Sequence, residues 1–169
     1  MAKRKTSKKQ DTAAASGITT VGLDIGYGVV KVATDDTALG FPSVMGHARE
    51  IKFQQETIQQ KYPGDRISDD EGEWFVGDLA LAQLPPGELL RLRGRTANEK
   101  TMGNAFRLRL AKVAIGKLVR GMWGRDVVHL RLSTGLPVDH MRDADELKES
   151  LLGQHVITTD SCEIIANIT

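Results

Sequence analysis

The chain has 169 residues, of which 40% are hydrophobic and 27% are charged, and its net charge is +1. This length suits one domain, or a tight pair of subdomains, and excludes several large domains. The sequence lacks the roughly 18-residue apolar run of a transmembrane helix, the apolar core of a secretory signal, and the paired cysteines of a disulfide framework. We therefore expect a cytoplasmic protein with no membrane partner.

Charge is distributed unevenly along the chain. Residues 65–78 hold six acidic residues and one basic residue, whereas residues 91–125 hold ten basic residues and one acidic residue. The simplest interpretation of each segment is a solvated surface. Segregated charge also favours an oriented contact with a partner. The alternatives are a filament contact between the acidic run and the basic segment of a neighbouring copy, and a contact of the basic segment with DNA or a DNA adaptor.

Residues 1–17 form a basic N-terminal segment with five Lys or Arg residues and one Asp. The segment is poor in hydrophobic residues and cannot bury enough surface to offset the entropy of ordering. We predict a disordered basic arm ahead of an ordered domain over residues 18–169. A solubilising tail is the simplest role for this arm. Contact with nucleic acid is the alternative, because Lys-rich arms release counterions from phosphate backbones.

Three short strands are predicted at the start of the ordered region. Residues 19–24 and 29–34 are rich in β-branched and apolar residues and are separated by a glycine-containing turn. An Asp-Asp turn then leads into a third strand over residues 37–41. The domain is therefore expected to begin with a three-strand meander.

Residues 42–95 follow as an irregular segment that contains four of the five prolines and many charges. Within it, residues 73–76 have the composition of a short strand. Gly77 and Asp78 are expected to cap a short helix over residues 79–83. We interpret the whole segment as a small subdomain inserted into the main domain.

Residues 100–122 show the clearest helical pattern in the chain. Apolar side chains recur at helical spacing along one face, formed by Met102, Phe106, Leu110, Val113, Ala114 and Leu118. This stripe indicates a helix packed on a sheet. The same spacing places Arg109, Lys112 and Arg120 at the edge of the stripe or on the opposite face.

Strand and helix alternate in the rest of the chain. An alternating strand is predicted over residues 127–134 and leads into a Gly-Leu-Pro loop. A capping-box pattern at residues 143–146 starts a helix that ends before Gly153. Two final strands, 155–159 and 163–168, flank an Asp-Ser turn. The order of elements predicts an α/β fold with a mixed sheet.

The residues best suited to chemistry lie between the first two strands, from Asp24 to Lys31, with Gly26 and Gly28 in the turn between them. Glycines leave backbone N–H groups uncovered, and these can point at phosphate oxygens. Lys31 can neutralise phosphate charge, and Asp24 can hold Mg²⁺ through water. The pattern is consistent with a phosphate clamp. It is also consistent with an ordinary β-hairpin that carries a surface lysine.

The remaining polar residues suggest no second site. The four histidines are scattered without the spacing of metal ligands, and Cys162 has no evident base beside it. No helix-turn-helix pattern is visible, so base-specific DNA recognition is not expected.

The arrangement resembles the actin-like ATPase superfamily, in particular the bacterial and archaeal actin-like proteins of the ParM/StbA type. Three segments carry the resemblance, in the family's order and at similar spacing over residues 18–169. These segments are Val21–Val32, the pair Phe41–Val44 and Trp74–Ala80, and Leu132–Val138. The first is similar to the family's first phosphate motif. The second is similar to the stretch through its small inserted subdomain, and the third to the strand and loop after its long helix.

The resemblance implies an α/β, ribonuclease-H-like (actin-like ATPase) domain with a mixed sheet and a small inserted subdomain. Members of the family bind ATP and Mg²⁺ in a cleft between two such domains and polymerise into filaments that position plasmid DNA. The resemblance also implies that Asp24 is the catalytic acid on the side of Mg²⁺, which it would hold through water. Phosphate contacts would come from the turn, from a lysine and from the loop near the cleft floor, which are Gly26, Tyr27, Gly28, Lys31, Thr134 and Gly135. Tyr27 stands where many relatives carry a small hydroxyl residue.

The resemblance covers the first domain of the family only. The residue that positions the attacking water, the second phosphate loop and the adenosine pocket lie in the second half of family members, and this sequence reaches Thr169 about where that half begins. We therefore expect this chain alone to hydrolyse ATP negligibly and to bind it weakly, because phosphoryl transfer needs the phosphates clamped from several sides.

The predicted function is that of the N-terminal half of an ATP-dependent, filament-forming protein of the DNA-segregation type. Its expected partners are further copies of itself or a full-length actin-like protein. One alternative is part of another ATPase on the same fold, either chaperone-like or sugar-kinase-like. The other is a non-enzymatic module that binds or caps filaments.

Overall fold

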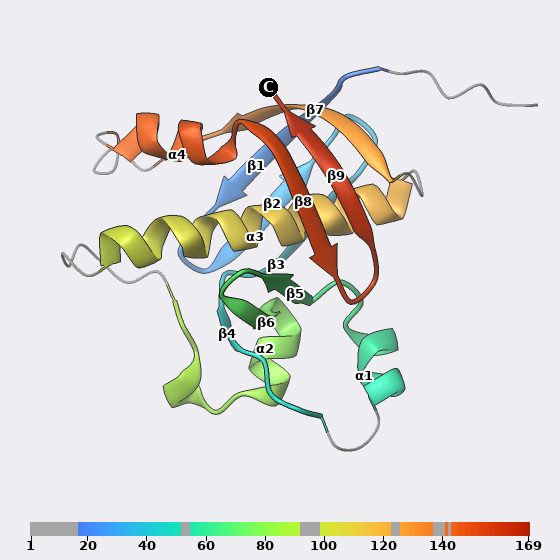
Figure 1. The fold of residues 1–169 in the computed structure, drawn as a ribbon, viewed down its shortest axis with the longest axis vertical. Helices are drawn as coiled ribbons and strands as arrows, with labels where there is room; N and C mark the ends of the chain where they lie inside the picture. The colour runs from blue at the N-terminus through green and yellow to red at the C-terminus, as the bar shows by residue number, and fades with distance from the viewer. Residues whose placement is uncertain (1–16, 52–54, 92–98, 123–125, 137–140, 142) are drawn as a thin grey trace, which may run out of the picture.

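The structure, a computed structural model, describes residues 17–51, 55–91, 99–122, 126–136, 141 and 143–169. Within these residues nine strands form one sheet (Figure 1). They are β1 (Thr19–Ile25), β2 (Val29–Ala33), β3 (Ala38–Pro42), β4 (Met45–His47), β5 (Arg66–Asp69), β6 (Gly72–Val76), β7 (Val127–Thr134), β8 (Gly153–Thr159) and β9 (Glu163–Ile168). The helices are α1 (Gln55–Lys61), α2 (Gly77–Gln83), α3 (Glu99–Met122) and α4 (Ala144–Leu151), with a 3₁₀ turn over Pro86–Glu88.

Parts of four predictions lie outside the described residues. They are the basic arm up to residue 16, the end of the proposed insertion at residues 92–95, residues 92–98 and 123–125 of the basic segment, and residues 137 and 138 of the loop after the long helix and its strand. None of the helices in the described part of the chain has the length and apolar character needed to cross a membrane.

The sheet is mixed, as the sequence predicts, and its strand order is β3-β2-β1-β7-β9-β8-β5-β6-β4. β7 pairs in parallel with β1 and with β9, and the other neighbouring pairs are antiparallel. β1, β2 and β3 form the predicted meander. Because β1 and β7 run in the same direction, their carboxyl ends meet at one edge of the sheet, which is where open α/β sheets bind ligands.

Helix α3 is the centre of the hydrophobic core. It contacts β3, β2 and β1 from one end of the strand order and β8 and β5 from the other, so the sheet bends around it (Figure 1). Five of the six residues of the predicted apolar stripe are buried, with Phe106, Leu110, Val113, Ala114 and Leu118 all 6% exposed or less. The side chain of the sixth, Met102, lies outside the described ones. The helical spacing of the stripe therefore identified the face of α3 that packs on the sheet.

Period-two alternation orients the side chains of the meander. Val21 and Leu23 on β1 are buried, as are Val30 and Val32 on β2. The intervening side chains point to the opposite face of the sheet. This alternation places the polar residues at the end of β1 and in the middle of β2 in contact with solvent.

Three elements of the structure were not predicted, namely β4, α1 and β5. β4 has only three residues, and α1 carries a single apolar residue, Ile58, among polar ones. Neither has a period that identifies it. At Gly46 in β4 a Cβ would lie 2.8 Å from the carbonyl oxygen of Glu88 and would collide with Leu84. Tertiary packing therefore forms this strand, and local preference does not.

The predicted helix caps are not formed as expected. α2 begins at Gly77, so Gly77 and Asp78 lie inside the helix. A carboxylate from another segment caps its first turn instead, because the Leu79 N–H donates to Asp65 Oδ2 at 3.3 Å. Asp143 stands at the N-cap of α4 with φ −96° and ψ 8° and makes no side-chain capping bond. A capping side chain needs an extended backbone at this position, which Asp143 does not adopt.

The acidic and basic segments contact each other within the chain. Arg109 of α3, which was predicted at the edge of the apolar stripe or on the face opposite it, is 6% exposed. Its guanidinium pairs with Asp69 at 2.5 Å and with Glu71 at 2.7 Å. Lys117 of α3 pairs with Asp65, which is 1% exposed and not a solvated residue. Three of the six acidic residues of this run therefore pair with two cations of α3.

A second, smaller apolar cluster lies beneath the end of the sheet that contains β4 and β6. It consists of Phe75, Leu79, Ala80 and Leu84, with residues of α1 and the following loop packed around it. We propose that this cluster is the core of the inserted small subdomain. Its strands continue the main sheet through the β5–β8 pairing, so the subdomain and the rest of the fold share one set of hydrogen bonds.

Burial of Asp65 makes the stability of the fold depend on pH. Desolvation raises the pKa of this carboxyl above 3.8, although the hydrogen bond and charge of Lys117 and the Leu79 N–H act in the opposite direction. A raised pKa in the folded state gives a stabilising contribution that is complete below 3.8 and is lost as the pH rises through the folded value. We expect this loss to be absent from Asp65→Asn.

The measurement is the urea-unfolding free energy of wild type and Asp65→Asn at a series of pH values. As the pH rises from below 3.8, the unfolding free energy of the wild type should fall relative to that of Asp65→Asn. The exposed turn carboxyl variant Asp36→Asn serves as the control. If the unfolding free energies of wild type and Asp65→Asn change in parallel with pH, the buried carboxyl does not cause the pH dependence.

Candidate phosphate-binding site

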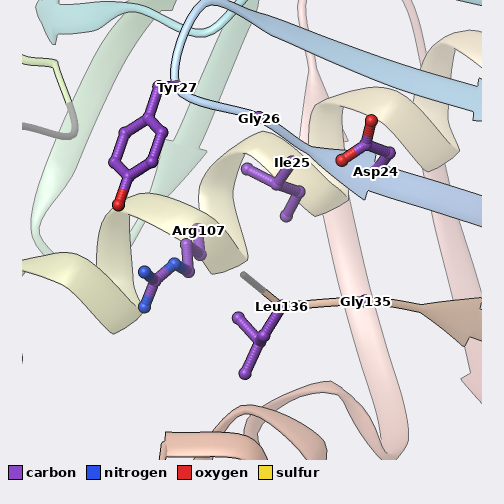
Figure 2. Close-up of a pocket in the computed structure, with 7 residues that line it drawn as sticks. All are labelled: Asp24, Ile25, Gly26, Tyr27, Arg107, Gly135 and Leu136. Atoms are coloured by element: carbon purple, nitrogen blue, oxygen red, sulfur yellow. The ribbon is translucent and has the colours of Figure 1, made fainter. Parts of the chain in front are cut away.

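The predicted site residues gather where β1 and β7 end. Leu23 of β1 lies opposite Thr134 of β7 in the parallel register, so Asp24 and Gly135 follow at neighbouring positions. A pocket of about 280 Å³ opens here between the turn after β1, the segment after β7, and α3 (Figure 2). Its lining residues are Asp24, Ile25, Gly26, Tyr27, Arg107, Gly135 and Leu136.

A larger and more open groove of about 730 Å³ adjoins the pocket over the ends of β1, β2, β3 and β7. Lys31 and Thr134 line this groove. Asp24 and Gly135 line both the groove and the pocket. The structure therefore brings six of the seven predicted residues together around two spaces that share two lining residues. Gly28 lines neither, and its carbonyl oxygen accepts the Ser43 N–H at 3.0 Å, which ties the turn to the end of β3.

Asp24 and Lys31 lie directly opposite each other in the β1–β2 register. Lys31 Nζ is 3.5 Å from Asp24 Oδ2, and the two side chains are 68% and 62% exposed. An ion pair this exposed contributes about 0–1 kcal/mol to stability. Either partner can therefore exchange the other for a ligand at little cost.

Glycine has a different role at each position of the site. The Gly26 N–H donates to the Val29 carbonyl oxygen at 3.1 Å, and a Cβ at Gly26 would lie 3.0 Å from that same oxygen. The tight turn therefore needs a glycine at position 26. At Gly28 and Gly135 a Cβ would meet nothing within 4 Å. These two positions border open space, so their backbone can be approached closely by a ligand.

Arg107 is a pocket residue that the sequence analysis missed. It lies on α3 next to the buried Phe106, is half-buried, and lines the pocket with the turn residues (Figure 2). No motif marks it, because the pattern of α3 identifies the buried stripe and not the turn that the helix ends up facing. Within the described residues no group of three or more His, Cys, Asp or Glu side chains forms a metal centre.

Comparison with known proteins identifies the family. The family model described as actin like proteins N terminal domain matches residues 22–168. No curated protein matches the chain. Solved structures of ParM proteins share the fold at less than 25% sequence identity.

Three of these proteins illustrate the match. Bacillus thuringiensis ParM in its apo form is 16% identical with a TM-score of 0.66, and covers 90% of this chain and 44% of its own. Apo pSK41 ParM is 19% identical with a TM-score of 0.64, and the match covers 89% of this chain and 47% of the pSK41 protein. The ParM protein of a 15-stranded filament from Clostridium botulinum is 22% identical with a TM-score of 0.61, and the match covers 90% of this chain and 46% of that protein.

Bacillus thuringiensis ParM also matches in structures with AMPPNP and with ADP, at TM-scores of 0.57 and 0.53. In every one of these comparisons the chain spans less than half the length of the matching protein. The strand order, the meander and the family match over residues 22–168 lead to one conclusion. The chain belongs to the actin-like proteins and corresponds to their N-terminal domain.

Proposed function

We propose that this chain supplies the first phosphate-binding turn of a nucleotide site in an actin-like, filament-forming protein. The observation that carries the proposal is the meeting of Asp24, Gly26, Tyr27 and Gly135 around one pocket at the carboxyl ends of β1 and β7. Backbone N–H groups of a glycine turn suit phosphate oxygens, and the edge of the sheet is where α/β folds hold ligands.

Each residue has a role in this proposal. Lys31 contacts phosphate as a point charge from the groove, and the turn at Gly26–Gly28 offers backbone amides. Of these, the Gly26 N–H would have to give up its bond to the Val29 carbonyl oxygen. Asp24 is the acid on the metal side. Its carboxylate is exposed, lies at the shared edge of both spaces and has an exchangeable partner, which suits a Mg²⁺ ion that keeps most of its water. Bound Mg²⁺ would neutralise charge on the phosphates.

The matched ParM structures support the wider part of the proposal. They include forms with AMPPNP and ADP and a filament. We propose that this chain likewise acts with ATP or ADP, in the cytoplasm, and assembles with copies of itself or with a full-length actin-like partner. Contact with DNA through the basic arm is a further proposal.

The decisive experiment is a thermal-shift titration with Mg-ATP and Mg-ADP. A ligand present at about 100 times its Kd stabilises the folded state by about 2.7 kcal/mol. We expect wild type to be stabilised and Lys31→Ala to lose about tenfold or more in affinity, because a hydrogen bond to a charged group contributes about 1.5–3 kcal/mol.

Lys148→Ala, which removes an exposed lysine of α4, is the matched control and should bind as wild type does. Equal stabilisation of wild type and Lys31→Ala would exclude this turn as the phosphate site. Assembly is tested separately by nucleotide-dependent light scattering and by co-sedimentation with a full-length actin-like protein. Failure of both would contradict the filament part of the proposal.

A further inference from the structure

We propose that Arg107 is a second cationic phosphate ligand of this site, and that together with Lys31 it selects a polyphosphate over a single phosphate group. The inference rests on the proposed function, which it deepens by naming a residue that no motif indicates. Arg107 is carried by α3, whereas the predicted site residues belong to the turn, to β2 and to the end of β7.

The position of the side chain is the first argument. Figure 2 shows Arg107 projecting from α3 on the same side of the pocket as the Tyr27 ring, with Asp24 on the other side and Leu136 below. Arg107 Nη1 lies 3.9 Å from where a Cβ would stand on Gly103, one helical turn earlier. The side chain therefore folds back along α3, as long helical side chains do, with its guanidinium beside the pocket.

The pairing of charges is the second argument. Arg109 of α3 is bound to carboxylates of β5 and of the turn that follows it, and Lys117 is bound to Asp65, which directly precedes β5. Among the described residues, no salt bridge joins Arg107 to an acid. A half-buried guanidinium beside a pocket lined by glycine backbone is suited to an anion, because its planar fork of donors matches phosphate oxygens.

The arrangement of the two spaces indicates the size of the ligand. Lys31 lines the groove and Arg107 lines the pocket, and the two spaces share Asp24 and Gly135. A ligand that reaches both cations has to pass this shared edge. A chain of phosphates can do so, and a single phosphate would contact one cation only. The ligand class is therefore a di- or triphosphate.

A simpler role for Arg107 is to cover Ile25 and Leu136 with its aliphatic stem. Arg107→Gln keeps part of the stem and removes the charge, and Arg107→Lys keeps the charge and removes the planar fork. Arg120→Gln removes the same charge from an exposed position about 20 Å further along the same helix and is the matched control. A covering role predicts changes in stability and no change in anion affinity.

The probe is sodium tripolyphosphate, titrated in the millimolar range into the isotopically labelled chain while backbone amide NMR signals are recorded. We expect saturable shifts centred on Gly26, Gly28 and Gly135. The Kd should rise at least about tenfold in Arg107→Gln and less in Arg107→Lys, and should stay unchanged in Arg120→Gln. Inorganic phosphate should bind more weakly than tripolyphosphate to wild type, and this difference should shrink in Arg107→Gln.

An Arg107→Gln variant that binds tripolyphosphate as wild type does would overturn the inference. If Lys31→Ala loses binding in the same series, the proposed function stands and only the role of Arg107 fails. Loss of binding in Arg107→Gln with normal binding in Lys31→Ala would support Arg107 and contradict the lysine role. A wild type without saturable shifts near the pocket would overturn both.

Discussion

Replacing Phe75 with alanine is expected to lower the free energy of unfolding by about 3–5 kcal/mol. Phe75 is 0% exposed and is the largest side chain of the cluster that includes Leu79 and Leu84. Its ring also lies against the guanidinium of Arg66, 5.9 Å from centroid to Cζ. A cavity in this small cluster has few neighbours that can collapse into it, so most of the lost packing should appear as lost stability.

Urea unfolding followed by circular dichroism measures this effect. Leu81→Ala is the control, because Leu81 lies on α2 as well but is 44% exposed, and it should change stability by no more than about 0.5 kcal/mol. We also expect one cooperative transition in Phe75→Ala, because β5 joins the small cluster to the main sheet. A separate early transition would show that residues 42–91 unfold independently of the rest.

Arg109→Met is expected to destabilise the fold by about 3 kcal/mol, since it removes one partner of a buried ion pair. Asp69 receives the Arg109 guanidinium on Oδ2 and the Trp74 indole N–H on Oδ1, at 2.5 and 3.3 Å. The guanidinium also lies over the Trp74 ring at 4.1 Å. Burial alone would raise the pKa of Asp69, but the hydrogen bond and charge of Arg109 hold it below its ordinary value.

The double variant Arg109→Met/Asp69→Asn separates this explanation from simple loss of packing. It removes the Asp69 carboxylate together with the cation and leaves only Glu71, which is 66% exposed, without Arg109, so it should be more stable than the sum of the two single losses predicts. The double-mutant cycle compares the unfolding free energies of wild type, the two single variants and the double variant. Strictly additive losses would show that the two side chains do not act as a pair.

The parts of the fold with a clear period could be predicted from the sequence. The meander over β1, β2 and β3, the buried stripe of α3 and the alternating strand β7 all follow from residue spacing. Asp24 at the end of β1 and Lys31 in β2 were also predicted, and the register of the hairpin places them opposite each other. Their chemical roles remain predictions.

The features of the fold and the site that could not be predicted depend on contacts between segments far apart in the sequence. The acidic run was expected on a solvated surface, and nothing in its spacing reveals that Asp65 and Asp69 face Lys117 and Arg109 of α3. α1 and β4 carry too few apolar residues to show a period. Arg107 was missed for the same reason, because its place beside the pocket depends on where α3 crosses the turn after β1.

Arg107 and Arg109 are two residues apart on α3, which places them about 200° apart around the helix axis. One lines the pocket, and the other is bound to the hairpin of β5 and β6. Any state of the protein in which α3 shifts must change both sets of contacts together. Occupancy of the pocket and formation of the Arg109 contacts with the hairpin are then coupled, and each shifts the equilibrium of the other by the same factor. The tripolyphosphate titration, repeated on Arg109→Met, would show how far the hairpin contacts alter the affinity of the pocket.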